Sequence, residues 1–359
     1  MNQRSHKEQE PRVKAGLKKP SILRQLVPWA IAVIILAFMF HEVNFGKLLE
    51  ILREADAAML VGAFLVYSLY YYLTDILSFW KTYKWFNTDI SFQETARLRF
   101  ASYSLQAING ALAEIVTLLY MFRVKRVPVL HATSSALFIY FIETWTLLVL
   151  LTYAAFFLPP ENRIFLDLPR LNMALWEFFQ IIVIAGWVSC FAVVVFWRTK
   201  LRDRLAWVRD NNLLMAFKHA YLENYGEVFL YRFSNNLLSV FMNILMLKAL
   251  GIKAPFALLF AVVPIMVNVA YLPVSAGGFG GPQLVAHYLL KGYATEEAIL
   301  AYSLAWSALF LLTRVFTGLP FLKTVYRIAF PQENISGEGD SSKGGQSREE
   351  FSGNVDRDG

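Results

Sequence analysis

Helix-breaking residues and an amide gather inside one of the most apolar parts of the chain. Residues 272–290 read LPVSAGGFGGPQLVAHYLL. The glycines and the proline predict that one membrane helix ends here and another begins. The first N–H groups of the new helix would have no partner within it, and its positive dipole end could receive a phosphate or a carboxylate. The candidate substrate-binding residues of this break are Gly277, Gly278, Gly280, Gly281 and Gln283.

A second break lies in the sequence SLQAINGALAE, where Asn109 and Gly110 interrupt an apolar stretch and Glu114 follows one turn later. Ionisable groups inside a membrane are costly, so each of them is a candidate for function. Glu114 would bind substrate, a coupling cation or a proton, or it would stabilise the positive start of its own helix. Glu143, near the middle of the next apolar stretch, is a candidate for substrate contact or proton relay.

Other polar residues within or beside the apolar stretches have alternative interpretations. Asn268 is predicted to line a polar cavity. Three further asparagines would line it too or join helices by hydrogen bonds: Asn235, Asn236 and Asn243. Asp75 and Arg314 are expected to pair with each other or to extend toward the membrane surface. The cations of the FRVKR segment would anchor the inner face and gather phosphate headgroups: Arg123, Lys125 and Arg126.

No enzyme motif accompanies these residues. The sequence has no Walker loop, HExxH, GxSxG or Cys/His metal spacing. It therefore predicts no catalytic residue, no metal and no cofactor, and any transport would follow an ion gradient or run downhill. The net charge of +7 is interpreted as an inner-face signal rather than as nucleic-acid binding, because basic residues crowd positions 1–24.

The elements that must position these residues are membrane helices. Hydrophobic residues make up 57% of the chain and charged residues only 17%, with a mean hydropathy of +0.43. Several apolar runs are long enough to cross a hydrocarbon layer of ~30 Å as a helix. The predicted fold class is therefore an all-α polytopic membrane protein. About six full spans are expected, at residues 25–41, 57–80, 130–157, 173–197, 229–249 and 298–322.

Two further apolar stretches, 99–121 and 255–290, are predicted to be re-entrant helical hairpins. A full crossing by the first would place the basic clusters before and after it on opposite sides, against the positive-inside rule. Each half of the chain then reads span, span, hairpin, span, in opposite orientations. Residues 25–157 and 173–322 are therefore hypothesised to form an inverted repeat that holds substrate near the midplane, at the broken helices.

Polar tails flank the transmembrane domain, which is assigned to residues 25–325. Residues 1–24 are predicted to be a basic cytoplasmic tail. Residues 331–359 are acidic and nearly free of apolar side chains, so they are predicted to be a disordered tail, also in the cytoplasm. Residues 198–225 are expected to form an amphipathic helix on the inner face or a linker. The segments 81–99, 121–128 and 198–218 are also expected on the inner side.

Two stretches resemble the signatures of a known family. LPVSAGGFGGPQLVAHYLLKGYATEEAILAYSLAW and NGALAEIVTLLYMFRVKRVPVLHATSSALFIYFIET are similar to the late and early signatures of the flippase-like family, also called the lysylphosphatidylglycerol synthase transmembrane region. The resemblance covers approximately residues 22–325. It implies roles for Glu114, Glu143, Gly277, Gly278, Gly280 and Gln283.

The chain departs from the family pattern at three positions. Ala113 replaces the usual glycine, Gln283 the usual glutamate, and Thr144 an arginine that commonly follows the glutamate. A protonatable role at Gln283 is thereby excluded. The chain resembles stand-alone members of the family, without the aminoacyl-transfer domain of full synthases, and the resemblance implies a prokaryotic inner membrane.

These observations predict a protein that translocates an anionic, phosphate-bearing lipid or lipid-linked precursor between leaflets. One alternative is an ion-coupled transporter of a small solute. Another is a membrane partner of a lipid-modifying enzyme that transports nothing. The expected partners are membrane lipids and, in the last case, that enzyme; the sequence leaves the oligomeric state open.

Overall fold

The structure is a computed structural model that describes residues 44–108, 110–157, 167–168, 173–269, 281–321 and 323. Within these ranges, side chains are described except at 107–112, 167–175, 268 and 269. The predicted first span, both tails, Asn109 and the glycines at 277, 278 and 280 lie outside the described residues.

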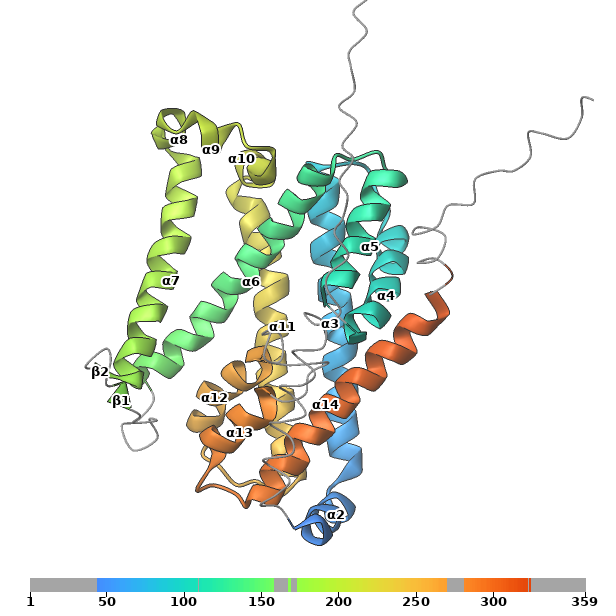
Figure 1. The fold of residues 1–359 in the computed structure, drawn as a ribbon, viewed down its shortest axis with the longest axis vertical. Coiled ribbons are helices and arrows are strands. Elements are labelled where there is room, and N and C mark those ends of the chain that lie inside the picture. The colour runs from blue at the N-terminus through green and yellow to red at the C-terminus, as the bar shows by residue number, and fades with distance from the viewer. Residues whose placement is uncertain are drawn as a thin grey trace, which may run out of the picture.

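The described chain is almost wholly helical, which confirms the predicted fold class (Figure 1). The helices are α2 (Phe45–Glu54), α3 (Ala57–Phe86), α4 (Phe92–Ile108), α5 (Gly110–Arg123), α6 (Val129–Phe157), α7 (Leu175–Arg198), α8 (Leu201–Arg204), α9 (Ala206–Arg209), α10 (Met215–His219), α11 (Leu222–Ala249), α12 (Phe256–Val269), α13 (Gly281–Leu290) and α14 (Glu296–Gly318). The minor elements are two 3-10 turns, Asn212–Leu214 and Leu319–Phe321, and an antiparallel pair of two-residue strands, β1 (Asp167–Leu168) and β2 (Met173–Ala174).

Four of the described helices are long and apolar enough to cross a membrane: Ala57–Phe86, Val129–Phe157, Trp176–Arg198 and Glu296–Phe321. Each is formed by a run of apolar residues. Asp56 begins α3 by accepting a hydrogen bond from the Met59 N–H (2.9 Å), and Thr295 begins α14 in the same way. With 30 residues, α3 extends about 45 Å, and it packs along α11, which has 28 residues.

Both predicted interruptions divide an apolar stretch into two shorter helices. α4 ends at Ile108 and α5 begins at Gly110, and the two helices pack against each other. α12 ends at Val269 and α13 begins at Gly281, and these two helices also pack against each other. Figure 1 shows α4 and α5 in the upper half of the bundle and α12 and α13 in the lower half. The hairpins thus occupy opposite ends of the molecule, as the charge pattern predicts.

Each hairpin also packs on the last long helix of the other half of the chain. α4 contacts α14, and α12 contacts α6. The contact between α4 and α14 is very close at Gly318, because a Cβ atom there would lie 2.4 Å from the Cβ atom of Ser104. Glu94, near the start of α4, links this helix to the end of α5. It forms an ion pair with Lys125 (2.8 Å) and accepts a hydrogen bond from the Tyr120 hydroxyl.

The segment after α7 forms a chain of short elements instead of one amphipathic helix. The backbone leaves helical geometry at Leu205, between α8 and α9. Asn211 then accepts a hydrogen bond from the Leu213 N–H (2.9 Å) and starts a 3-10 turn. Asparagine offers the backbone this alternative to helix hydrogen bonds, so the segment is a linker with one-turn helices.

Candidate functional site

A polar cavity of about 300 Å³ lies between α3, α4, α6 and α11, and Val267 of α12 closes part of it. Its lining is mostly charged, amide and phenol side chains from four helices. These are Tyr67, Tyr71, Asp75, Arg99, Gln106, Tyr140, Glu143, Arg232, Asn235 and Asn236. Polar side chains from four helices therefore converge on this cavity.

Asp75 of α3 holds the deep end of the cavity together. Its side chain is 2% exposed and accepts hydrogen bonds from Arg99 Nε (2.8 Å), Arg232 Nη2 (2.9 Å) and the Tyr103 hydroxyl (2.6 Å). Three helices, α3, α4 and α11, meet at this carboxylate. A buried carboxylate is tolerated only when it is paired and hydrogen-bonded, and Asp75 meets both conditions.

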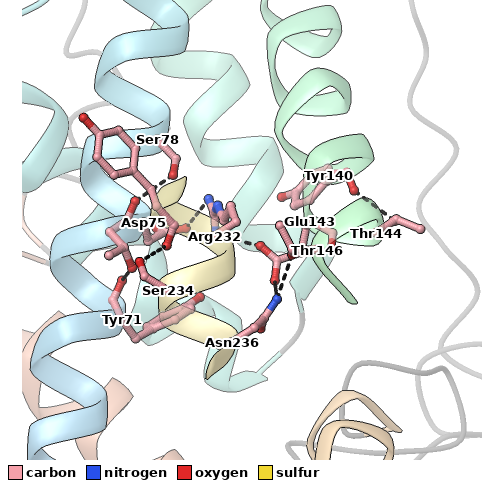
Figure 2. Close-up of polar contacts among 12 residues, drawn as sticks. Tyr71, Asp75, Ser78, Tyr140, Glu143, Thr144, Thr146, Arg232, Ser234 and Asn236 are labelled. Carbon is pink, nitrogen blue, oxygen red and sulfur yellow. Dashed lines mark hydrogen bonds and ion pairs between the residues drawn. The ribbon is translucent and has the colours of Figure 1, made fainter. Parts of the chain in front are cut away.

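Each of the two guanidiniums has a second, looser carboxylate partner. Arg99 Nη1 lies 3.5 Å from Glu114 Oε1 of α5, and Arg232 Nη1 lies 3.4 Å from Glu143 Oε2 of α6. Figure 2 shows Arg232 between Asp75 and Glu143. The Glu114 and Glu143 side chains are 26% and 29% exposed, whereas both arginines are buried. Asp75 is thus the closest and most buried partner of both arginines, and the two glutamates lie farther away and are partly exposed.

Phe79 lies under both guanidiniums. The Cζ atom of Arg99 is 3.8 Å from the centre of the Phe79 ring, and that of Arg232 is 6.0 Å away. Phe79 is fully buried one turn after Asp75 on α3. Cations are attracted to an aromatic face, so the ring helps to hold the two positive charges side by side at the deep end.

The wall between α6 and α11 carries a smaller network. Asn236 Nδ2 donates to Glu143 Oε1 (3.0 Å) and to Thr146 Oγ1 (2.9 Å). This network fixes one carboxylate oxygen of Glu143 and leaves the other facing Arg232, as Figure 2 shows.

Several buried polar atoms of the cavity make no hydrogen bond to any residue that the structure describes. They are Arg99 Nη1, Gln106 Oε1, Glu143 Oε2, Arg232 Nε and Asn235 Oδ1. Buried polar groups nearly always find a partner in protein, water or ligand. Donors and acceptors that make no hydrogen bond to the described residues therefore share this cavity, and a ligand that binds there must satisfy both.

The structure brings some of the predicted residues together at the cavity and places others elsewhere. Glu143, Asn235 and Asn236 line the cavity, and Glu114 reaches Arg99 at its edge. The expected pairing of Asp75 with Arg314 is wrong, because Arg99 and Arg232 bind Asp75. The Arg314 guanidinium instead packs on the Phe310 ring, 3.6 Å from its centre.

The described residues of the second break, Gly281 and Gln283, do not line this cavity. Gln283 is fully buried and donates to the Ser307 hydroxyl (2.9 Å) and the Ser303 carbonyl (3.2 Å), so it joins α13 to α14. Asn243 also joins helices, because the Tyr302 hydroxyl donates to it (2.7 Å). Gly281 is the first residue of α13.

Two predicted positions have no described side chain, and the three of the basic patch lie at the end of the bundle. Gly110 begins α5, and Asn268 follows the cavity residue Val267 on α12. The basic patch of Arg123, Lys125 and Arg126 lies between α5 and α6, away from the cavity, and Lys125 is paired with Glu94. Arg123 and Arg126 are exposed there.

Sequence reasoning missed both arginines of the cavity. Arg99 was expected at the edge of the inner segment 81–99, but α4 begins at Phe92 and carries Arg99 two turns into the hairpin. Arg232 lies inside the predicted span 229–249, so the rule that charges within spans indicate function could have found it. No local pattern near either residue indicates that Asp75 is their common partner.

The sequence model of the lysylphosphatidylglycerol synthase TM region family matches residues 25–318. No curated protein matches the chain.

Proposed function

Since the chain belongs to the lysylphosphatidylglycerol synthase transmembrane-region family, we propose that it moves an anionic, phosphate-bearing lipid between membrane leaflets. The family and the fold make it a multi-pass membrane protein linked to lipid modification or flipping. We also propose that the protein lies in a prokaryotic inner membrane with both termini in the cytoplasm. It would move the lipid without modifying it chemically.

One observation carries the proposal, namely two buried guanidiniums side by side in a polar cavity of a membrane bundle. Charges inside a membrane are costly and mark substrate paths. A guanidinium matches phosphate oxygens in geometry and keeps its charge when buried. Arg99 and Arg232 together offer a receptor for the phosphate of a headgroup.

The three carboxylates decide how a phosphate can bind. Asp75 stays with both arginines at 2.8 and 2.9 Å. Glu114 and Glu143, at 3.5 and 3.4 Å, are replaced by the incoming phosphate. Two guanidiniums and one carboxylate then leave one net positive charge for the headgroup. When the glutamates return to the arginines, the phosphate is released, so binding remains reversible.

The exposure of the lining supports entry from the side. Asp75 is 2% exposed at the deep end, whereas Tyr140 of α6 is 42% exposed and Thr144 is also exposed. A headgroup could enter along this open wall while its acyl chains stay in lipid. The same cavity would hold a small soluble anion, so an ion-coupled solute transporter is the second candidate.

Leaflet exchange in liposomes tests the proposal. Purified protein is reconstituted with headgroup-labelled anionic lipids, and the wild type is compared with Arg232→Gln. The matched control is Arg209→Gln, because Arg209 lies outside the cavity and pairs only with surface aspartates among the described residues. We expect exchange to fall at least about tenfold in Arg232→Gln and to persist in the control.

Two results would count against translocation. If the wild type exchanges no lipid of a broad panel faster than empty liposomes do, the proposal is wrong. If it instead takes up soluble glycerophosphate without lipid exchange, the solute transporter replaces it. Thermal unfolding of each variant shows whether a loss reflects misfolding.

A further inference from the structure

The charge of the cavity is unbalanced. Asp75, Glu114 and Glu143 contribute three negative charges, and Arg99 and Arg232 contribute two positive charges. With all five groups ionised, the group carries one net negative charge inside the membrane, where an uncompensated charge is costly.

Arg314 is a further buried cation of the described residues, and it lies outside this group. Its guanidinium packs on Phe310 and is 6.0 Å from the ring of Tyr71, and it does not line the cavity. None of the three carboxylates of the cavity forms an ion pair with it.

Three buried acceptors of the cavity make no hydrogen bond to the described residues and lie on three different helices; one of them, Glu143 Oε2, has only its looser ion pair with Arg232 at 3.4 Å. Gln106 Oε1 comes from α4, Glu143 Oε2 from α6 and Asn235 Oδ1 from α11, and each is buried without a hydrogen bond within the described residues. Asn235 is only 4% exposed and lines the cavity. Carboxylate and amide oxygens are the ligands that hard cations prefer.

We propose that these three oxygens bind one monovalent cation with the ligand preference of Na⁺. A single positive charge neutralises the group, whereas a divalent ion would reverse its sign. Ion sites of this kind occur in secondary transporters beside broken helices near the midplane. Gln106 lies three residues before the break between α4 and α5.

The cation and the phosphate would assist each other. A cation at Glu143 draws that carboxylate away from Arg232, which lies 3.4 Å from it. Arg232 then keeps Asp75 and gains the phosphate. Linkage requires the reverse effect as well, so bound phosphate must tighten the binding of the cation. The coupling of cation binding to lipid transport rests on the proposed function. The binding of the cation to these three oxygens does not depend on it.

Binding of ²²Na⁺ to the purified full-length protein tests the inference, with choline as the inert replacement ion. We expect one saturable site in the wild type. The affinity should fall at least about tenfold in Glu143→Gln, which loses the charged ligand, and clearly in Asn235→Leu, which loses an uncharged one. Glu227→Gln is the matched control, because Glu227 pairs with Lys81 outside the cavity. It should bind Na⁺ as the wild type does.

Inorganic phosphate provides a second readout. Saturating phosphate should raise the affinity for Na⁺ by about fivefold or more in the wild type and not in Arg232→Gln. The absence of saturable Na⁺ binding, or equal binding by the wild type, Glu143→Gln and Asn235→Leu, would overturn the inference. So would lipid exchange that depends on pH while Na⁺ does not bind.

Failure of this inference and failure of the proposed function are distinguishable. Lipid exchange without Na⁺ binding would show that the cation site is wrong, and the proposed translocation would still stand. Saturable Na⁺ binding that depends on Glu143, without lipid exchange, would support the cation site and show that the proposed translocation is wrong.

Discussion

At the scale of single residues, the cavity contains two kinds of ion pair. Asp75 is buried and binds both arginines at hydrogen-bond distance, so it holds α3, α4 and α11 together. Glu114 and Glu143 are partly exposed and lie farther from the same arginines. The first kind stabilises the fold, and the second kind competes with a ligand.

Substitution of Asp75 should therefore destabilise the protein far more than substitution of Glu143. Asp75→Asn leaves two buried guanidiniums without their shared carboxylate, and we expect a loss of about 3–5 kcal/mol in the free energy of unfolding. Glu143→Gln keeps the hydrogen bond from Asn236 possible and should cost less than about 1 kcal/mol. Denaturant unfolding in detergent micelles measures both. Equal losses of unfolding free energy in Asp75→Asn and Glu143→Gln would show that the two carboxylates contribute equally to stability.

The same contrast predicts an opposite effect on binding. In Glu143→Gln the competing charge at Arg232 is gone, so a phosphate headgroup should bind at least about fivefold more tightly than in the wild type. The measurement is the concentration of glycerophosphate that half-inhibits lipid exchange. Its value should also lose its dependence on Na⁺ in this variant. A weaker inhibition would mean that Glu143 helps to bind the headgroup instead of competing for Arg232.

At the scale of elements, much of the architecture could be predicted and the centre of the site could not. Gly110 and Gly281 marked the starts of α5 and α13 because glycine breaks helices locally. The partners of Asp75 were mispredicted because they come from α4 and α11, which are distant in sequence. Local pattern shows that a charge lies in a membrane, and tertiary packing decides what it binds.

The contact between α4 and α14 should be sensitive to a single methyl group. In Gly318→Ala the new Cβ would meet Ser104 at 2.4 Å, including its backbone at 2.6 Å, so the helices must separate. We expect a loss of about 1–3 kcal/mol in the free energy of unfolding.

Gly62→Ala is the matched control on α3, because its new Cβ meets nothing within 4 Å. That variant should be unchanged or more stable by about 0.5–1 kcal/mol, since alanine favours helix. Equal effects of the two substitutions in denaturant unfolding would exclude a special contact at Gly318.

At the scale of the whole molecule, the two hairpins lie at opposite ends of the bundle, and each packs on the last long helix of the other half. This cross-packing supports the proposed inverted repeat. The two halves differ in chemistry, however. In the first half the helix after the break carries Glu114 at the charged cavity, whereas in the second half Gln283 is tied to serines of α14. We therefore expect ligands to bind at the charged cavity beside the first break, where α11 of the second half also contributes Arg232.

Cysteine accessibility tests the opposite orientation of the hairpins. With Cys190 replaced by alanine, single cysteines are placed at Val124, after α5, and at Lys291, after α13; both positions are exposed. An impermeant thiol reagent should label position 124 from the inner side and position 291 from the outer side of an oriented membrane. Labelling of both from one side would contradict the arrangement.

The most direct test of the account asks whether the headgroup passes through the charged cavity. A photoreactive residue is placed at Thr144, which lines the cavity and is exposed, and a control at Leu69, an exposed apolar residue of α3 that does not line it. Headgroup-labelled anionic lipid should crosslink at position 144, and less so when Arg232→Gln is added. Equal capture at positions 144 and 69, unchanged by Arg232→Gln, would show that lipid touches only the outer surface and would contradict the account.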